Sequence, residues 1–176
     1  RKSNTYFLER YFDWDGILIE SKKSFSDCSK KIRKCHSVNS TVDFKQHFID
    51  FYYYHGTSGI CDADTDNDTR YFKNGFGSYV KLFTTTLEHI LDEYNAPENI
   101  DYLSLDIEGS EYRILKNFDF NKYNIKIISI ERAFSIDKNN KSKEYIESKK
   151  LLQELLSKNN YKYIHSCGYD DIFIKE

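Results

Sequence analysis

The segment from Ile100 to Asn117 constrains the fold of this chain more than any other part of the sequence. Its residues IDYLSLD predict a buried strand that ends on Asp106, and the following IEGS predicts a turn. Residues 111–117 predict the start of a helix after this turn. A strand, a tight turn and a helix in this order are typical of α/β proteins, in which helices connect parallel strands.

The same alternation extends along the chain. We expect strands at 16–20, 35–42, 48–55 and 125–130, and helices at 4–12, 22–34, 85–96 and 144–158. Residues 56–77, rich in Gly, Asp, Asn and Thr, predict a long loop. Two short strands, 161–165 and 171–175, flank Gly168 and predict an antiparallel pair at one edge. The sequence therefore predicts one domain over residues 1–176, with a doubly wound, mostly parallel sheet and an antiparallel C-terminal edge pair.

Composition excludes several classes of protein. The 176 residues suffice for one hydrophobic core, and 16% aromatic residues exclude a chain that is mainly disordered. No apolar run is long enough to span a membrane, and a net charge of -2 gives no electrostatic case for nucleic acid. The four cysteines have irregular spacing, so we expect reduced thiols and a cytoplasmic location. The absence of methionine and the start at Arg1 lead us to expect a piece of a longer chain.

Three predicted strands end on an acid. These residues are Glu20, Asp106 and Glu131. In an open doubly wound sheet, ligands bind at the carboxyl ends of the strands. An acid at such a position commonly accepts hydrogen bonds from a ribose diol, because a carboxylate offers two oxygens at one spot. For Glu20, the pattern alone leaves a ribose ligand and a solvated strand end equally open.

The turn after Asp106 concentrates carboxylates. Asp106 and Glu108 have the same parity along an extended backbone, so they can face one region, and Gly109 permits a tight turn. Crowded acids are typical of a general base or a metal ligand. For Glu111 we favour a simpler role, a first-turn acid that interacts favourably with the helix dipole.

No calcium-loop or zinc motif is predicted. The run Asp62–Asp68 matches the first positions of a calcium-binding EF-hand loop. However, Asn67 stands where glycine is required and Lys73 where a bidentate glutamate is required, so a solvated acidic loop is the better interpretation. The five histidines show no zinc-binding spacing.

Several segments together resemble the FkbM-type methyltransferase family. The most specific is the block LSLDIEGSE with its strand and helix, within residues 100–111. Residues 4–9 and 16–20 are similar to the front half of that family, and residues 125–131 and 169–174 to its later strands. The resemblance covers nearly the whole chain in the expected order.

The resemblance implies a class I, Rossmann-like fold that binds S-adenosylmethionine. Glu20 would then hold the ribose of the cofactor. Asn4 would lie just past the cofactor loop, and Asn39 would lie where such folds contact the adenine ribose or ring.

The implied reaction is methyl transfer to a hydroxyl of a sugar or a small natural-product-like acceptor. Asp106 would lie beside the methyl-transfer centre and contact the cofactor, with Glu108 and Glu131 lining the pocket. Methyl transfer from a sulfonium is an in-line displacement, so the protein must align the reactants and help to remove the hydroxyl proton. Asp106 is the expected base, or alternatively a ligand of a metal that acidifies the alcohol.

Two departures from the family pattern leave a second interpretation open. The family's first strand and its glycine-bearing loop should precede Ser3, so we expect the sheet to lack its first strand. Ser21 also stands where the family usually has proline. The alternative is a non-catalytic domain that keeps the methyltransferase fold for protein or glycan contacts.

Overall fold

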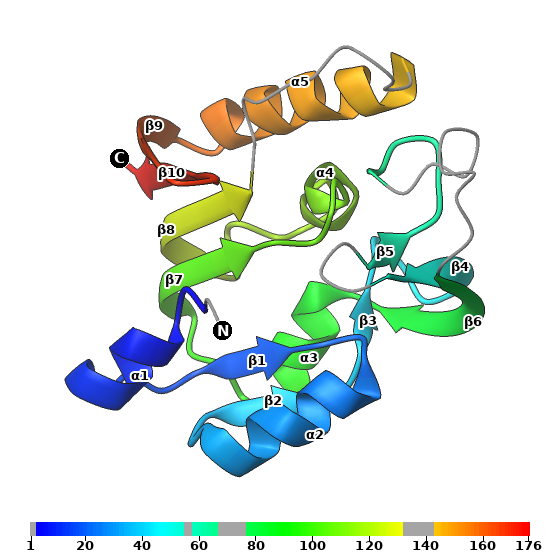
Figure 1. Ribbon diagram of the computed structural model, residues 1–176. Helices are drawn as coiled ribbons and strands as arrows, with labels where there is room; N and C mark the ends of the chain where they lie inside the picture. Colours follow the sequence, from blue (N-terminus) through cyan, green and yellow to red (C-terminus); the bar gives the residue numbers. More distant parts are fainter. Residues whose placement is uncertain (1–2, 55–57, 67–76, 132–142) are drawn as a thin grey trace.

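The computed structural model describes residues 3–54, 58–66, 77–131 and 143–176. Within these ranges it has five helices and ten strands arranged in three sheets. Figure 1 shows the helices distributed around the sheets. None of the helices in these ranges combines the length and apolar character needed to cross a membrane.

The largest apolar core lies around a four-stranded sheet in the order β7-β8-β10-β9. Its strands are β7 (Asn99–Leu105), β8 (Asn124–Glu131), β9 (Tyr161–Cys167) and β10 (Asp170–Lys175). Strand β8 is parallel to β7 and antiparallel to β10, and β9 forms the antiparallel edge. The predicted antiparallel C-terminal pair is therefore confirmed.

Strand β8 shows why this sheet forms. Its residues NIKIISIE bury Ile125, Ile128 and Ile130, each at most 1% exposed. β-branched side chains pack well on a pleated surface, and a strand between two neighbours is apolar over much of its length. The core of the domain therefore centres on β8.

A separate parallel pair consists of β1 (Ile17–Ile19) and β2 (His36–Val38). Ile17 and Ile19 of β1 pack against the same core as β7 and β8. Figure 1 draws the arrows of β1 and β7 pointing in the same direction. Among the described residues no ladder joins these two strands, so one continuous doubly wound sheet, as predicted, is not observed.

The third sheet was not predicted as a sheet, although one of its strands, Phe48–Tyr53, lies within the strand expected over 48–55. It has the order β3-β6-β4-β5, with mixed pairing. The strands are β3 (Thr41–Val42), β4 (Phe48–Tyr53), β5 (Gly59–Ile60) and β6 (Ser78–Thr85). The expected long loop over 56–77 is thus wrong at β5, while residues 55–57 and 67–76 lie outside the described part. The expected strand over 35–42 is divided into β2 and β3.

Five helices in the described part cover these sheets. They are α1 (Tyr6–Phe12), α2 (Lys23–Ile32), α3 (Leu87–Glu93), α4 (Glu111–Leu115) and α5 (Lys143–Lys158). Thr86 is the N-cap residue of α3, and its side chain accepts a hydrogen bond from the backbone N–H of His89. Helix α5 buries Leu152 and Leu156 in the main core and contacts α4 and β9.

Candidate functional site

Three of the predicted acids lie together. The carboxylates of Asp106, Glu108 and Glu131 have oxygens within 4.8 Å of one another. Asp106 is exposed and the two glutamates are half-buried, so the group is accessible from solvent. We call these residues the carboxylate trio. Oxygen atoms this close suit the sharing of a proton or the binding of a hard cation such as Mg²⁺ or Ca²⁺.

The register of two parallel strands brings the trio together. Leu105 of β7 pairs with Ile130 of β8, so the next residues, Asp106 and Glu131, follow at the same edge of the sheet. Glu108 returns to this edge through a tight turn, in which it has φ 55° and Gly109 has φ 88°. Since a non-glycine residue rarely adopts a positive φ, the surroundings must hold Glu108 in place.

The helix after the turn is fixed from inside the protein. Glu111, 1% exposed, accepts a hydrogen bond from the N–H of Gly109 at 3.2 Å and forms a 3.0 Å ion pair with Lys149 of α5. Lys149 is itself only 2% exposed. Glu111 lies in the first turn of α4, as expected, and the structure adds a second role that was not expected, because this acid is also a buried link between α4 and α5.

Asn4 reaches the same edge of the sheet from the N-terminal segment. Its side-chain amide donates to Ser104 Oγ at 3.0 Å and to Asp170 Oδ2 at 2.7 Å. Asp170 is the register partner of Glu131. The Asn4 side chain is therefore held near the trio by Ser104 and Asp170, and its expected position near a cofactor stays a prediction.

Glu20 and Asn39 follow β1 and β2, at the carboxyl ends of the parallel pair. The Asn39 amide donates to the backbone carbonyls of Glu20 and Ser21, at 2.9 and 3.0 Å. One Glu20 oxygen accepts the N–H of Lys22 at 2.9 Å. Asn39 therefore holds the backbone that carries Glu20, and Glu20 itself is not a member of the trio.

Tyr53 of the third sheet completes the surroundings of Glu20. Its hydroxyl donates to the Ser21 carbonyl at 3.1 Å. Burial raises the pKa of Tyr53, and the negative charge of Glu20 raises it further. The β4 strand thus contacts the segment after β1 although no sequence pattern connects the two.

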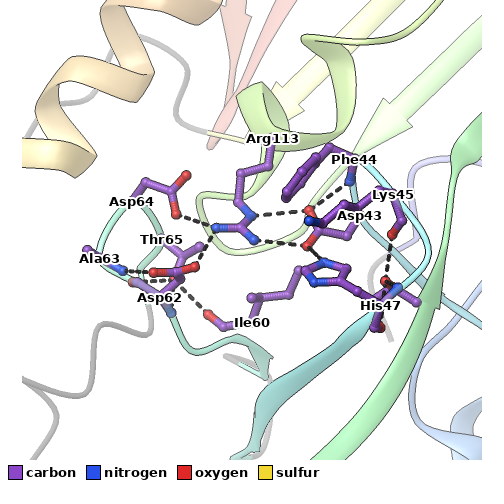
Figure 2. A network of polar contacts seen from close by, with 11 residues as sticks. Asp43, Phe44, Lys45, His47, Ile60, Asp62, Ala63, Asp64, Thr65 and Arg113 are labelled. Atoms are coloured by element: carbon purple, nitrogen blue, oxygen red, sulfur yellow. Dashed lines mark hydrogen bonds and ion pairs between the residues drawn. The ribbon is translucent and has the colours of Figure 1, made fainter.

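A buried arginine links α4 to two distant segments, as Figure 2 shows. Arg113, 5% exposed, donates from Nε and Nη2 to both oxygens of Asp43, at 3.1 and 2.9 Å. Its Nη1 donates to Asp62 at 2.8 Å and to Asp64 at 2.7 Å. His47 Nε2 lies 2.9 Å from Asp43 Oδ2. We call these five side chains the Arg113 network.

Electrostatics in this network favour the charged forms of Asp43 and Arg113. Burial by itself would raise the pKa of Asp43, but the hydrogen bonds and positive charge of Arg113 outweigh it, so the pKa lies below its usual value. Although burial by itself would lower the pKa of Arg113, the carboxylates of Asp43 and Asp64 raise it. Because Asp62 and Asp64 bind an arginine, the described part of the acidic loop is an ion-paired element. The solvated loop expected there is observed only in part, because Asp62 remains half-exposed, and Asn67 and Asp68 lie outside the described residues.

Two cavities lie near these groups. One of about 660 Å³ is bordered by Arg113, by the acidic loop and by the first turns of α5. Another of about 450 Å³ is bordered by Asn39 together with residues of α3 and β6. The lining of these two cavities does not include the carboxylate trio, which lies at the accessible carboxyl ends of β7 and β8.

The mixed α/β fold, with acids gathered at strand ends, is consistent with a methyltransferase-like domain. Comparison with known families gives a match to the methyltransferase FkbM domain over residues 1–170. The chain therefore belongs to the FkbM methyltransferase family, which confirms the resemblance in its sequence. No curated protein and no solved structure gives a significant match to the chain.

Proposed function

We propose that this chain is an S-adenosylmethionine-dependent O-methyltransferase that acts on a hydroxyl of a sugar or small natural-product-like acceptor. Family membership supports methyl transfer. The observation that carries the proposal is the carboxylate trio, which gathers three potential proton acceptors at the ends of β7 and β8. Ligands of open α/β sheets bind at this end of the strands.

The residues of the chain fit the proposed cofactor. Glu20 accepts one hydrogen bond from Lys22, and a carboxylate has about four acceptor sites, so two ribose hydroxyls can also bind. Asn39 fixes the backbone of Glu20. Asn4 lies beside the trio and would border the methionine part. When bound, S-adenosylmethionine supplies an electrophilic methyl group.

Asp106 is the proposed general base. It is the exposed member of the trio, and it would accept the proton of the acceptor hydroxyl at a carboxylate oxygen. Glu108 and Glu131 would orient the acceptor through further hydrogen bonds. A divalent cation bound by the same three carboxylates is the second way to acidify the hydroxyl, and activity after dialysis against EDTA distinguishes the two.

We also propose that β1–β2 and β7–β8–β10–β9 are two parts of one doubly wound sheet, interrupted between β1 and β7. Their common core and the equal direction of β1 and β7 support this arrangement.

All four cysteines carry free thiols, which supports a cytoplasmic location.

The test measures binding and transfer separately. S-adenosylmethionine is titrated calorimetrically into the full-length protein, and release of S-adenosylhomocysteine is followed with a panel of sugar and small-alcohol acceptors. We expect Glu20→Ala to abolish binding. Asp106→Asn should retain binding and reduce transfer at least about 100-fold. Asp101→Asn is the matched control, because Asp101 is an exposed acid of β7 that pairs with Lys126 on the surface.

Each outcome has a clear meaning. Unchanged affinity in Glu20→Ala would remove Glu20 from the cofactor site. Equal transfer by Asp106→Asn and Asp101→Asn would refute the role of Asp106 as a base. Absence of any S-adenosylmethionine binding by the wild-type protein would favour the non-catalytic domain that binds proteins or glycans.

A further inference from the structure

The Arg113 guanidinium is held in one orientation by several hydrogen bonds. Four hydrogen bonds from three of its nitrogens go to three carboxylates. Asp43 is fully buried, and its second oxygen is shared with His47. Buried ion pairs contribute little to stability on balance, whereas a guanidinium with paired hydrogen bonds has a defined orientation. This geometry points to a role in fixing the segments it joins.

The segments that Arg113 joins are far apart in the sequence. It lies on α4, 70 residues from Asp43 and 51 and 49 residues from Asp62 and Asp64. Asp43 directly follows β3, and its own N–H donates to the Thr85 carbonyl of β6. One end of the network is therefore anchored in the third sheet, and the other end is the short loop 62–66.

That loop contacts the turn that carries Glu108. The backbone N–H of Asp66 donates to the Glu108 carbonyl at 2.9 Å. A Cβ added to Gly109 would lie 2.7 Å from the same Asp66 nitrogen, which shows how closely the two backbones approach. The loop is also held from the other side, since Ser148 of α5 donates to the Asp64 carbonyl.

We propose that Arg113 is a positioning residue for Glu108. It holds loop 62–66 against the turn, and the loop in turn holds the Glu108 backbone at its positive φ, so that the Glu108 carboxylate stays within the trio. This role rests on the proposed methyltransferase function only for its catalytic consequence. The structural link itself is independent of any substrate.

Hydrogen exchange of the Asp66 amide tests the link directly. In Arg113→Lys, which keeps the charge but loses the paired hydrogen bonds, we expect this amide to exchange at least about tenfold faster. Asp64→Asn should accelerate exchange of the Asp66 amide to a smaller degree. This second variant tests the same link if Arg113→Lys does not fold. The matched control is Arg33→Lys, because Arg33 forms an equally buried 2.7 Å pair with Glu9 elsewhere in the domain.

Unchanged Asp66 exchange in both network variants would overturn the proposal. So would an equal acceleration of the β8 amides, since that would indicate general loss of stability. In the transferase assay, kcat should fall at least about tenfold while the KM for S-adenosylmethionine stays within about twofold. Faster Asp66 exchange with an unchanged kcat would refute the positioning of Glu108 for catalysis. A wild-type protein without transferase activity would refute the proposed function and leave the exchange result to decide the structural link.

Discussion

Replacing Gly109 by alanine tests how tightly the turn of the carboxylate trio is built. Gly109 has φ +88°, a conformation that costs a residue with a Cβ roughly 1–2 kcal/mol. The new Cβ would also lie 2.7 Å from the Asp66 nitrogen and 3.0 Å from the Tyr145 ring. The Asp66 nitrogen belongs to the backbone, so it cannot move aside without disturbing its hydrogen bond to Glu108.

The two contributions add to a substantial destabilisation. Overpacking of a well-filled site typically costs about 1–3 kcal/mol. Together with the backbone strain, Gly109→Ala should lower the free energy of unfolding by about 2–5 kcal/mol. The chain offers two controls. Gly168→Ala has a positive φ of 67° but no atom within 4 Å of the new Cβ, so it should cost only about 1–2 kcal/mol. Gly16→Ala has neither feature and should change stability by about 0.5 kcal/mol or less.

Urea denaturation followed by circular dichroism measures all three variants. A common slope of the unfolding free energy against urea would show that the denatured states are comparable. The reasoning predicts the order Gly109, Gly168, Gly16 from most to least destabilised. If Gly109→Ala and Gly168→Ala differ by less than about 0.5 kcal/mol, the close approach of Asp66 to the turn is refuted.

Two further predictions concern buried ion pairs. Burial alone would raise the pKa of Glu9, but hydrogen bonds from Lys34 and Arg33 lower it to about 2, from 4.5 in an unfolded chain. The ionised Glu9 therefore stabilises the fold fully above pH 4.5, and this contribution is lost as the pH falls towards 2. Glu9→Gln should flatten the acid limb of a thermal-melting series over that interval, and an unchanged limb would contradict this. Lys149→Met leaves Glu111 buried without its cation and should cost about 3–5 kcal/mol in urea denaturation. The double variant with Glu111→Gln should recover most of that loss, and no recovery would contradict a specific pair.

The elements that the sequence predicts well are those with local signals. Strand β7 and helix α4 follow from an apolar stretch that ends on Asp106 and from the turn around Gly109 that precedes the helix. Helix α5 follows from a long amphipathic stretch, and the closing strands follow from the turn at Gly168. In each case neighbouring residues determine the structure, so a pattern in one window is sufficient.

Most of the third sheet lacks such signals, and only β4 matches an expected strand of its own, at 48–55. Strand β5 has two residues, and it is a strand only because Ile60 lies opposite Phe51 of β4. Strand β6 has few fully buried residues, so its hydrophobic pattern is weak. Strand formation depends strongly on the partner strand, and here β6 pairs with β4 across a long intervening segment. The sequence therefore predicts a loop at β5 and nothing definite at β6.

The candidate site also contains residues whose neighbours could be predicted from the sequence and residues whose neighbours could not. Asp106 and Glu131 could be predicted as neighbours, because each ends a strand and parallel strands end at one edge. The burial of Glu111 could not, because its partner Lys149 lies 38 residues away on a helix whose polar pattern indicates a solvent-exposed lysine. Strand ends give the position of an acid, but only the packing of helices gives its partner.

Arg113 shows why an acidic run is a poor guide to metal binding. In the sequence, Asp62 and Asp64 have the spacing of calcium ligands, whereas Arg113 resembles any surface arginine of a helix. In the structure, both acids point to its guanidinium, and a third acid, Asp43, comes from the end of β3. An interior cation accounts for these carboxylates without a bound ion. The carboxylate trio is a group of three acids whose oxygens lie within 4.8 Å of one another, and a titration with a divalent cation there would separate metal-assisted transfer from transfer by a general base.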